Sequence, residues 1–374
     1  MTDLAPAERA APEHRAVPST MRAVVLTRPG LEGVTLQDVP VPRPGRMELL
    51  CRVDSVYICG TDPHIIRGDY PGFWPKSYPF IPGHEWAGVV VGLGEGAAAF
   101  GWTLGDRVAG TSHAGCGYCR TCASGRYNLC QNYGDETRGH RQYGHYTAGA
   151  YADYVVHSVR SVFRVPDALS LEEAAAMDPA SIALHTVKRA EMAPGDTVAV
   201  IGPGPMGLMV LLCALALGAG RVLMVGRGQR LDRAVELGAE PVDFSKGDPV
   251  EAVRRATDGG ARCVIECAGT AETLAQAVSM ARKGGHVSAI GIPLEPAAID
   301  VKKLVLEEID LHGVRANRGT CEEVLPLMAR RAIDVTKLLT HRFPLEAFPE
   351  ALGAFVQRRD GAIKVLLKPG GSRD

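Results

Sequence analysis

Short apolar runs separated by Pro and Gly fill the first 165 residues of the chain. Clear examples lie at 23–26, 48–54, 86–92 and 154–157. Runs of four to eight β-branched and apolar residues between turn residues are typical of β-strands. The pattern therefore predicts a compact, β-rich first domain.

From residue 171 the pattern changes to strand and helix in alternation. Strands are predicted at 197–201, 221–225, 263–267 and 286–290, with helical stretches starting at Gly207, Leu231, Val250 and Glu272. Such alternation indicates βαβ units and a doubly wound parallel sheet, so the fold class is α/β. A helix at 321–331 and a last strand at 362–367 are expected to return to the first domain.

Composition adds limits to this picture. The chain has 374 residues, is 46% hydrophobic and carries a formal net charge of −1, which suits two globular domains. This balance favours neither a nucleic-acid nor a membrane partner, and the longest apolar stretch, 206–219, is too short to span a bilayer.

Residues 1–20 lack hydrophobic periodicity and are predicted to form a disordered tail. No secretion pattern opens the chain, so we expect a cytoplasmic protein whose cysteines are thiols and metal ligands.

Four cysteines cluster in a glycine-rich segment with the spacing Cys-x2-Cys-x2-Cys-x7-Cys: Cys116, Cys119, Cys122 and Cys130. Zinc accepts four thiolates in a tetrahedron, and close spacing lets one loop surround the ion. Disulfides between such near neighbours would have strained geometry. The spacing predicts a closed structural zinc site, and the alternative is four thiols that cluster by chance.

A glycine motif lies between the predicted strand at 197–201 and a long apolar helix. Gly202 permits a tight turn, Gly204 lets backbone approach a pyrophosphate, and Gly207 allows close packing of helix on strand. With Pro205 and Met206 they form the loop that opens the helix, whose N–H groups can bind phosphate. We expect this loop to bind a dinucleotide.

The end of the next strand bears on which dinucleotide is bound. An NAD site usually has Asp or Glu there to accept from the ribose hydroxyls. This chain has Gly226, with Arg227 and Arg230 nearby, and a guanidinium pairs bidentately with phosphate. The sequence favours NADP, and the alternative is NAD with two solvated arginines.

Three further segments, together with the glycine motif and the cysteine loop, resemble the zinc-dependent medium-chain alcohol dehydrogenases, near the sorbitol and threonine dehydrogenase branch. They read Cys59-Gly-Thr61-Asp-Pro-His64, Pro82-Gly-His84-Glu85 and Met177-Asp178-Pro179. The resemblance runs from Met21 to Pro369. It implies a GroES-like catalytic domain at 21–178, completed by 321–374, a Rossmann domain at 179–320, and a homodimer or homotetramer.

The resemblance also implies a catalytic zinc, in addition to the structural one. Its expected ligands are Cys59, His84 and Asp178, with Glu85 as a neighbouring or alternate ligand. Three protein ligands leave a fourth position for water or substrate, as catalytic zinc requires. Standing alone, Cys59 or His84 would be interpreted as a core residue rather than a ligand, and Asp178 could be a helix cap; the joint occurrence of the motifs favours the zinc site.

Zinc at such a site polarises the substrate oxygen as a Lewis acid. The resemblance implies that Thr61 takes the alcohol proton and passes it, through the cofactor ribose, to His64 near solvent. Imidazole suits this role because its pKa lies near neutrality. The alternative is an ordinary helix-start threonine and a surface histidine.

We therefore expect an oxidoreductase that moves hydride between a secondary alcohol or polyol and NAD(P). The aromatic and polar segments 67–76 and 138–146 would line its pocket, unless they are surface loops. Alternatives are a biosynthetic NADPH-dependent ketone reductase and a non-catalytic, zinc-stabilised redox sensor. The histidines without a motif partner are expected to be structural: His113, His157, His185, His286, His312 and His341.

Overall fold

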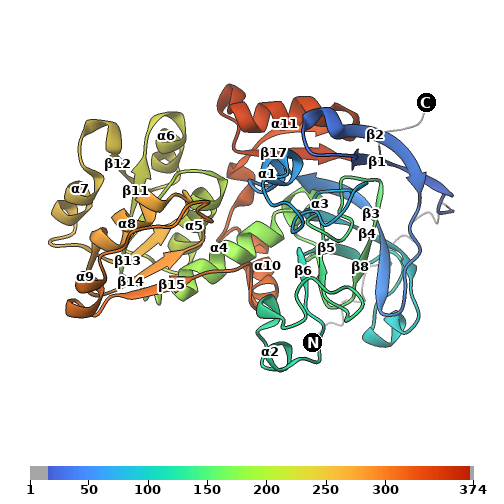
Figure 1. Ribbon diagram of the computed structural model, residues 1–374, viewed down its shortest axis with the longest axis horizontal. Helices are drawn as coiled ribbons and strands as arrows, with labels where there is room; N and C mark the ends of the chain where they lie inside the picture. Colours follow the sequence, from blue (N-terminus) through green and yellow to red (C-terminus); the bar gives the residue numbers. More distant parts are fainter. Residues whose placement is uncertain (1–15, 371–374) are drawn as a thin grey trace, which may run out of the picture.

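The computed structural model describes residues 16–370 and has two lobes, each built around one large sheet (Figure 1). The predicted disordered tail, 1–20, falls mostly outside the described residues, but its last residue, Thr20, already begins the first strand. Within the described chain, no helix combines the length and the apolar character needed to cross a bilayer.

One lobe contains a six-stranded sheet in which all neighbouring strands are parallel. Across the sheet the strands are β12 (Glu240–Asp243), β11 (Arg221–Gly226), β10 (Thr197–Ile201), β13 (Ala261–Glu266), β14 (Ala281–Ala289) and β15 (Asp310–Gly313). In chain order this is 3-2-1-4-5-6, the order of a doubly wound dinucleotide-binding fold. The predicted α/β class is confirmed.

Helices cover both faces of this sheet. Alternate residues of β10 point into different cores: Val198 and Val200 pack with α4 and α5, whereas Ala199 and Ile201 pack with α7 and α8. A strand covered on both faces needs apolar residues at every position, which explains the continuous apolar run that predicted it. The helices of this lobe are α4 (Met177–Arg189), α5 (Pro205–Ala216), α6 (Gly228–Glu236), α7 (Pro249–Ala256), α8 (Ala271–Met280) and α9 (Val301–Leu306).

The other lobe contains a seven-stranded, mainly antiparallel sheet. Its strands are β16 (Leu339–Pro344), β17 (Lys364–Lys368), β3 (Glu48–Tyr57), β4 (Glu85–Leu93), β5 (Arg107–Gly110) and β9 (Val162–Arg164), with β8 (Tyr154–Ser158) also paired to β3. β17 pairs with β3 through Leu366 and Tyr57. A strand near the C-terminus therefore joins a sheet whose other strands come mostly from the first half of the chain. A core around Trp86, Tyr151 and Phe348 packs on it.

The remaining strands and α-helices lie outside the two large sheets. They are the paired strands β1 (Thr20–Leu26) and β2 (Val34–Pro40), the paired strands β6 (His113–Ala114) and β7 (Arg141–Gln142), and the helices α1 (Asp62–Arg67), α2 (Arg120–Ala123), α3 (Leu171–Ala174), α10 (Cys321–Ala329) and α11 (Phe348–Gln357). β6 and β7 pair with each other and thereby close the base of the loop that carries the four clustered cysteines.

Candidate active site

The four clustered cysteines converge in the structure. Their sulfur atoms all lie within 4.8 Å of one another, and all four are free thiols. Sγ of Cys116 lies 3.9 Å from Sγ of Cys122, and Sγ of Cys119 lies 3.8 Å from Sγ of Cys130. Thiolates bound to one tetrahedral zinc at about 2.3 Å lie about 3.8 Å apart. Both distances are edges of that tetrahedron, so the donor set fits a closed zinc site.

The cysteine loop also packs against the other lobe. The Tyr127 hydroxyl donates to Oδ1 of Asn317, and Nδ2 of Asn128 donates to the backbone oxygen of Arg315 at 2.9 Å. Both acceptors lie in the segment that follows β15. A zinc that holds this loop in shape would therefore also hold the contact between the lobes.

A second group of metal-binding side chains comes from two strand ends. Tyr57, the last residue of β3, pairs with Glu85, the first residue of β4. Because the end of β3 lies beside the start of β4, Cys59 just after β3 and His84 just before β4 lie at the same end of these two strands. The ligand atoms of Cys59, His84 and Glu85 all lie within 4.8 Å of one another.

The environment of His84 is strongly negative. Burial alone lowers the pKa of His84, but the charges of Cys59 and two nearby carboxylates outweigh burial and raise that pKa to about 10. Thiolate, imidazole and carboxylate are the donors that zinc takes in proteins, so the residues fit a zinc ion.

Asp62 is a buried carboxylate beside His84 that the sequence reasoning did not single out. Its side chain is completely buried, and Oδ1 lies 3.6 Å from Nδ1 of His84. Oδ2 accepts from the backbone N–H of Cys59 at 2.7 Å. Metal-binding histidines generally turn their second nitrogen to a carboxylate, which orients the ring. An Asp three residues after a predicted zinc ligand, Cys59, could have indicated such a carboxylate from the sequence alone.

Asp178 lies near this group but outside it. Its Oδ1 accepts from Nδ2 of Asn317 at 3.1 Å and from the hydroxyl of Thr111, whereas Oδ2 is buried without a hydrogen-bond partner. Burial raises the pKa of Asp178 to about 6, although nearby His84 opposes the rise. The side chain makes no helix cap. Of the four expected ligand residues, the structure thus groups Glu85, rather than Asp178, with Cys59 and His84.

Thr61 and His64 lie at α1, directly beside the group. Thr61 precedes the helix, but its hydroxyl makes no capping hydrogen bond and is buried without a partner. His64 is partly exposed, and its Nδ1 lies 2.7 Å from Oδ2 of Asp69. The two residues therefore provide a buried hydroxyl without a partner and an imidazole at the surface.

The glycine motif forms the turn between β10 and α5. Gly202 has φ +97°, and a Cβ on Gly207 would meet the backbone oxygen of Gly202 at 2.0 Å, so a side chain at Gly207 would push helix and strand apart. Gly204 caps α5, whose first residues are Pro205 and Met206. The turn lies where the strand order reverses between β10 and β13, the usual place for a nucleotide in such sheets.

Comparison with known proteins agrees with this geometry. The profile of the alcohol dehydrogenase GroES-like domain matches residues 45–167, and that of the zinc-binding dehydrogenases matches 205–330. Over 92% of this chain and 98% of its own length, the L-threonine 3-dehydrogenase of Bacillus subtilis is 33% identical. The sorbitol dehydrogenase of the same organism is 31% identical, over 94% of this chain and 98% of its own.

The chain belongs to the zinc-dependent alcohol dehydrogenase family. Its predicted membership, fold class and enzyme class are confirmed: it is an oxidoreductase acting on alcohols or polyols with NAD(P). A zinc-binding dehydrogenase of Sinorhizobium meliloti 1021, solved with NADP, has a TM-score of 0.85 and 32% identity, covering 94% of this chain and 100% of its own. An alcohol dehydrogenase of Escherichia coli CFT073, solved with NADH, has the same TM-score and coverage at 26% identity.

In this dehydrogenase, Gly226 is the last residue of β11, where the sequence placed it. A Cβ there would meet Cγ of Pro203 at 2.4 Å, so the position has no room for a side chain. Arg227 follows, with its guanidinium 5.3 Å from the Phe244 ring centre. Arg230 donates through Nη2 to the backbone oxygen of Ala362 at 3.1 Å, and burial lowers its pKa to about 10.

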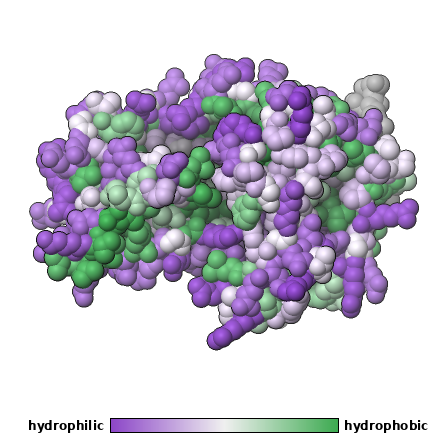
Figure 2. All heavy atoms as spheres, in the orientation of Figure 1, coloured by the Kyte–Doolittle hydropathy of each residue, from purple (hydrophilic) through white to green (hydrophobic). Residues whose placement is uncertain are grey.

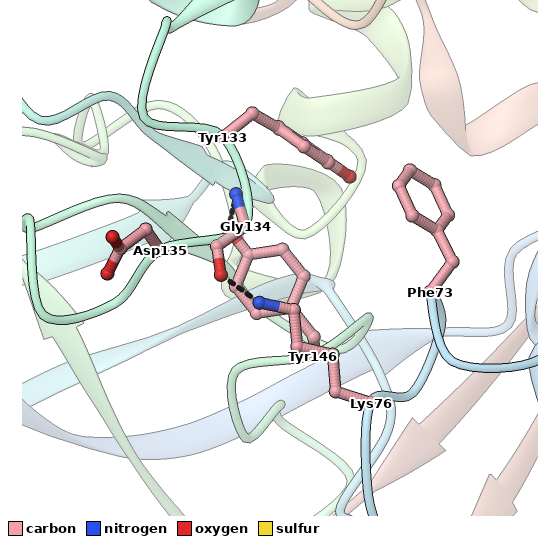
Figure 3. A pocket seen from close by; sticks show the side chains of 6 residues that line it. All are labelled: Phe73, Lys76, Tyr133, Gly134, Asp135 and Tyr146. Carbon is pink, nitrogen blue, oxygen red and sulfur yellow. Dashed lines mark hydrogen bonds between the residues drawn. The ribbon is translucent and has the colours of Figure 1, made fainter.

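An aromatic wall separates the His84 group of the dehydrogenase from a nearby pocket. The His145 ring lies 4.5 Å from the ring of His84 and 4.7 Å from that of Trp74. On the other side of Trp74 is a pocket of about 330 Å³, lined by Phe73, Lys76, Tyr133, Gly134, Asp135 and Tyr146. In Figure 3, Phe73 faces Tyr133, and the Lys76 ammonium group points to the Gly134 carbonyl. The segments 67–76 and 138–146 thus both contribute to this pocket.

Proposed function

We propose that this dehydrogenase acts on a hydroxyl-rich or cyclic secondary alcohol, with a catalytic zinc held by Cys59, His84 and Glu85. The observation that carries the proposal is the convergence of these three ligand atoms within 4.8 Å, beside the unpartnered Thr61 hydroxyl. Asp178 is the alternate ligand, because its Oδ2 is buried and without a partner. A zinc ion here supplies a Lewis acid that polarises the substrate oxygen.

The protein side of the reaction is proton transfer. The Thr61 hydroxyl is positioned to accept the alcohol proton, and His64 to release it to solvent. Nδ1 of His64 lies 2.7 Å from Oδ2 of Asp69 and 2.9 Å from Nη2 of Arg67, so Nε2 is the ring nitrogen left to take part in proton transfer. The buried rings of His145 and Trp74 cover one side of His84.

For the cofactor we favour NADP over NAD. Gly226 has no carboxylate to accept from a ribose 2′-hydroxyl, and Arg227 lies at the adjoining position with its guanidinium over the Phe244 ring. Arg230 supports the proposal less, because one nitrogen is already bonded to Ala362. The similar structures were solved with NADP in one case and NADH in the other, so they do not decide the preference.

The test is a panel of secondary alcohols, polyols and cyclitols assayed with NADP and NAD, together with zinc analysis. The proposal expects turnover of at least one hydroxyl-rich alcohol, with a higher kcat/KM for NADP, and two tightly held zinc ions per chain. Activity only in the ketone-reducing direction would favour the biosynthetic reductase. One zinc and no turnover with any substrate would favour the non-catalytic sensor.

We further propose that the functional form is a homodimer. Apolar side chains gather over α9 and the segment before it, where Figure 2 shows a green patch: Ile292, Leu294, Val301, Val305 and Leu306, each more than half exposed. They adjoin β15, the edge strand of the six-stranded sheet. An open edge beside an apolar patch fits a second copy that extends the sheet.

Replacing Val305 with Asp should give monomers in light scattering, and a Val305→Asp protein that stays dimeric would contradict this.

We also expect the protein in the cytoplasm, because a four-thiolate site requires a reducing compartment.

A further inference from the structure

A third cluster of metal-binding side chains lies in the nucleotide-binding lobe, away from both predicted zinc sites. The ligand atoms of Glu191, His286 and His312 all lie within 4.8 Å of one another. His286 belongs to β14 and His312 to β15, and Glu191 follows the end of α4. In the parallel register His312 stands opposite Ser288, two residues beyond His286, so both imidazoles project from the same face of the sheet.

The ring of His286 is already oriented for ligation. Its Nδ1 lies 3.4 Å from Oδ2 of Asp310, and its Nε2 lies 4.0 Å from Oε2 of Glu191. A carboxylate beside one imidazole nitrogen favours the proton there and leaves the other nitrogen with a free lone pair. The free pair of His286 then points toward Glu191, as a carboxylate–histidine–metal arrangement requires.

An unsatisfied nitrogen is the second observation. His286 is only 8% exposed. Nε2 of His312 is buried with no partner at all. Because a bound ion would lie beside Glu191, the unpartnered Nε2 of His312 is the buried atom that it would satisfy.

Arg189 is the group that competes with an ion. Its Nη2 lies 3.1 Å from Nδ1 of His312. Whichever nitrogen of His312 takes an ion, this hydrogen bond is lost, because Nδ1 then either binds the ion or carries the proton. The nearby arginine charge also contributes to the lowered pKa of His312, after burial, which keeps the ring neutral as a ligand must be.

From this geometry we infer a third divalent-cation site, formed by Glu191, His286 and His312, that takes zinc or a similar transition metal more weakly than the two expected zinc sites. Two imidazoles and one carboxylate suit zinc, nickel or cobalt and leave a position for water. The ion would join the end of α4 to the two last strands of the sheet. The inference does not depend on the proposed substrate or cofactor.

The test is a zinc titration of the full-length enzyme after its tightly bound zinc has been counted, followed by calorimetry. Wild type should bind one further zinc per chain, and the double variant His286→Gln, His312→Gln should not. Arg189→Gln should bind the extra zinc about tenfold more tightly, because about 1.4 kcal/mol of competition is removed. His341→Gln, a partly exposed histidine elsewhere, should behave as wild type.

No further zinc in wild type, or the same further zinc in the double variant, would overturn the inference. If the double variant does not fold, Glu191→Gln decides the question, because this side chain is 61% exposed and its replacement leaves the core intact. An unchanged zinc affinity in Glu191→Gln would then reject the site. Dehydrogenase activity should be unchanged in Glu191→Gln in either case.

Discussion

Lys364, on the last described strand, forms a buried ion pair with Glu85, the first residue of the strand that follows His84. The two side chains are only 4% and 3% exposed, and they come from residues 279 positions apart. Lys364 therefore compensates the charge of a carboxylate next to His84. Through this pair, the C-terminal strand β17 influences the charge next to His84.

In protein freed of zinc, replacing Lys364 with Met should destabilise the fold by about 3–5 kcal/mol, because the buried Glu85 carboxylate would lose its partner. Guanidinium denaturation at neutral pH measures the effect. The matched control is Lys368→Met, on the same strand, whose side chain is 38% exposed and pairs with Asp54. This control should cost less than about 1 kcal/mol. Equal costs in the two variants would contradict the role of the buried pair.

Replacing Asp62 with Asn should weaken zinc binding at the Cys59–His84–Glu85 group about 10–100-fold, since the carboxylate orients the His84 ring. Competition with a coloured chelator measures the affinity, and the zinc of the four-cysteine site should remain. Asp106→Asn, in a turn far from the group, serves as the control. Loss of both zincs together would indicate unfolding rather than a positioning role.

Replacing Thr61 with Ala should reduce kcat about 100–10,000-fold while zinc content stays the same, because only the proton acceptor is removed. Thr61→Ser keeps the hydroxyl and should recover most of the activity. Steady-state kinetics and metal analysis on the same samples test both. An unchanged kcat in Thr61→Ala would remove Thr61 from the mechanism.

Replacing Arg227 with Ala should raise KM for NADP about 10–100-fold and leave KM for NAD nearly unchanged, because a charged hydrogen bond contributes about 1.5–3 kcal/mol. Arg233→Ala, on the helix that follows Arg227 and paired with Glu236, is the control. If Arg227→Ala changes both KM values equally, Arg227 does not read the 2′-phosphate.

Stability should fall as the pH drops below about 6.5, because several histidines are buried in neutral form. Burial lowers the pKa of His157 to about 3, so the unfolded chain binds a proton there that the folded chain does not. Below the unfolded pKa of about 6.5 the folded state therefore loses stability, by about 2 kcal/mol at pH 5 for His157 alone. Thermal melts of His157→Gln should show a shallower decline between pH 7.5 and 5 than wild type or His341→Gln. An equal decline in all three would contradict this.

Motifs that are local in the chain could be understood from the sequence alone. The cysteines that run from Cys116 to Cys130 are joined by short segments, so their spacing restricts them to one site. The glycines from Gly202 to Gly207 likewise need only their own strand and helix. The continuous apolar run of β10 showed a strand covered on both faces, because each of its residues meets one of two cores.

Short edge elements escaped prediction. β12, β15 and β16 have mixed or exposed residues, because a strand at the edge of a sheet is covered less than one at its centre, and its apolar pattern is correspondingly weak. Helix α9 was missed for a related reason: it exposes apolar side chains instead of burying one stripe.

The sequence by itself determined the fold class, the dinucleotide turn and the cysteine site, since these depend on periodicity and on residues close in the chain. Only the tertiary structure decided that Glu85 joins Cys59 and His84, that Lys364 pairs with Glu85, and that two histidines regarded as structural meet Glu191. Contacts between distant residues depend on how strands pair and helices pack. A one-residue change of register would reverse which side chains face each other, and no local pattern encodes that choice.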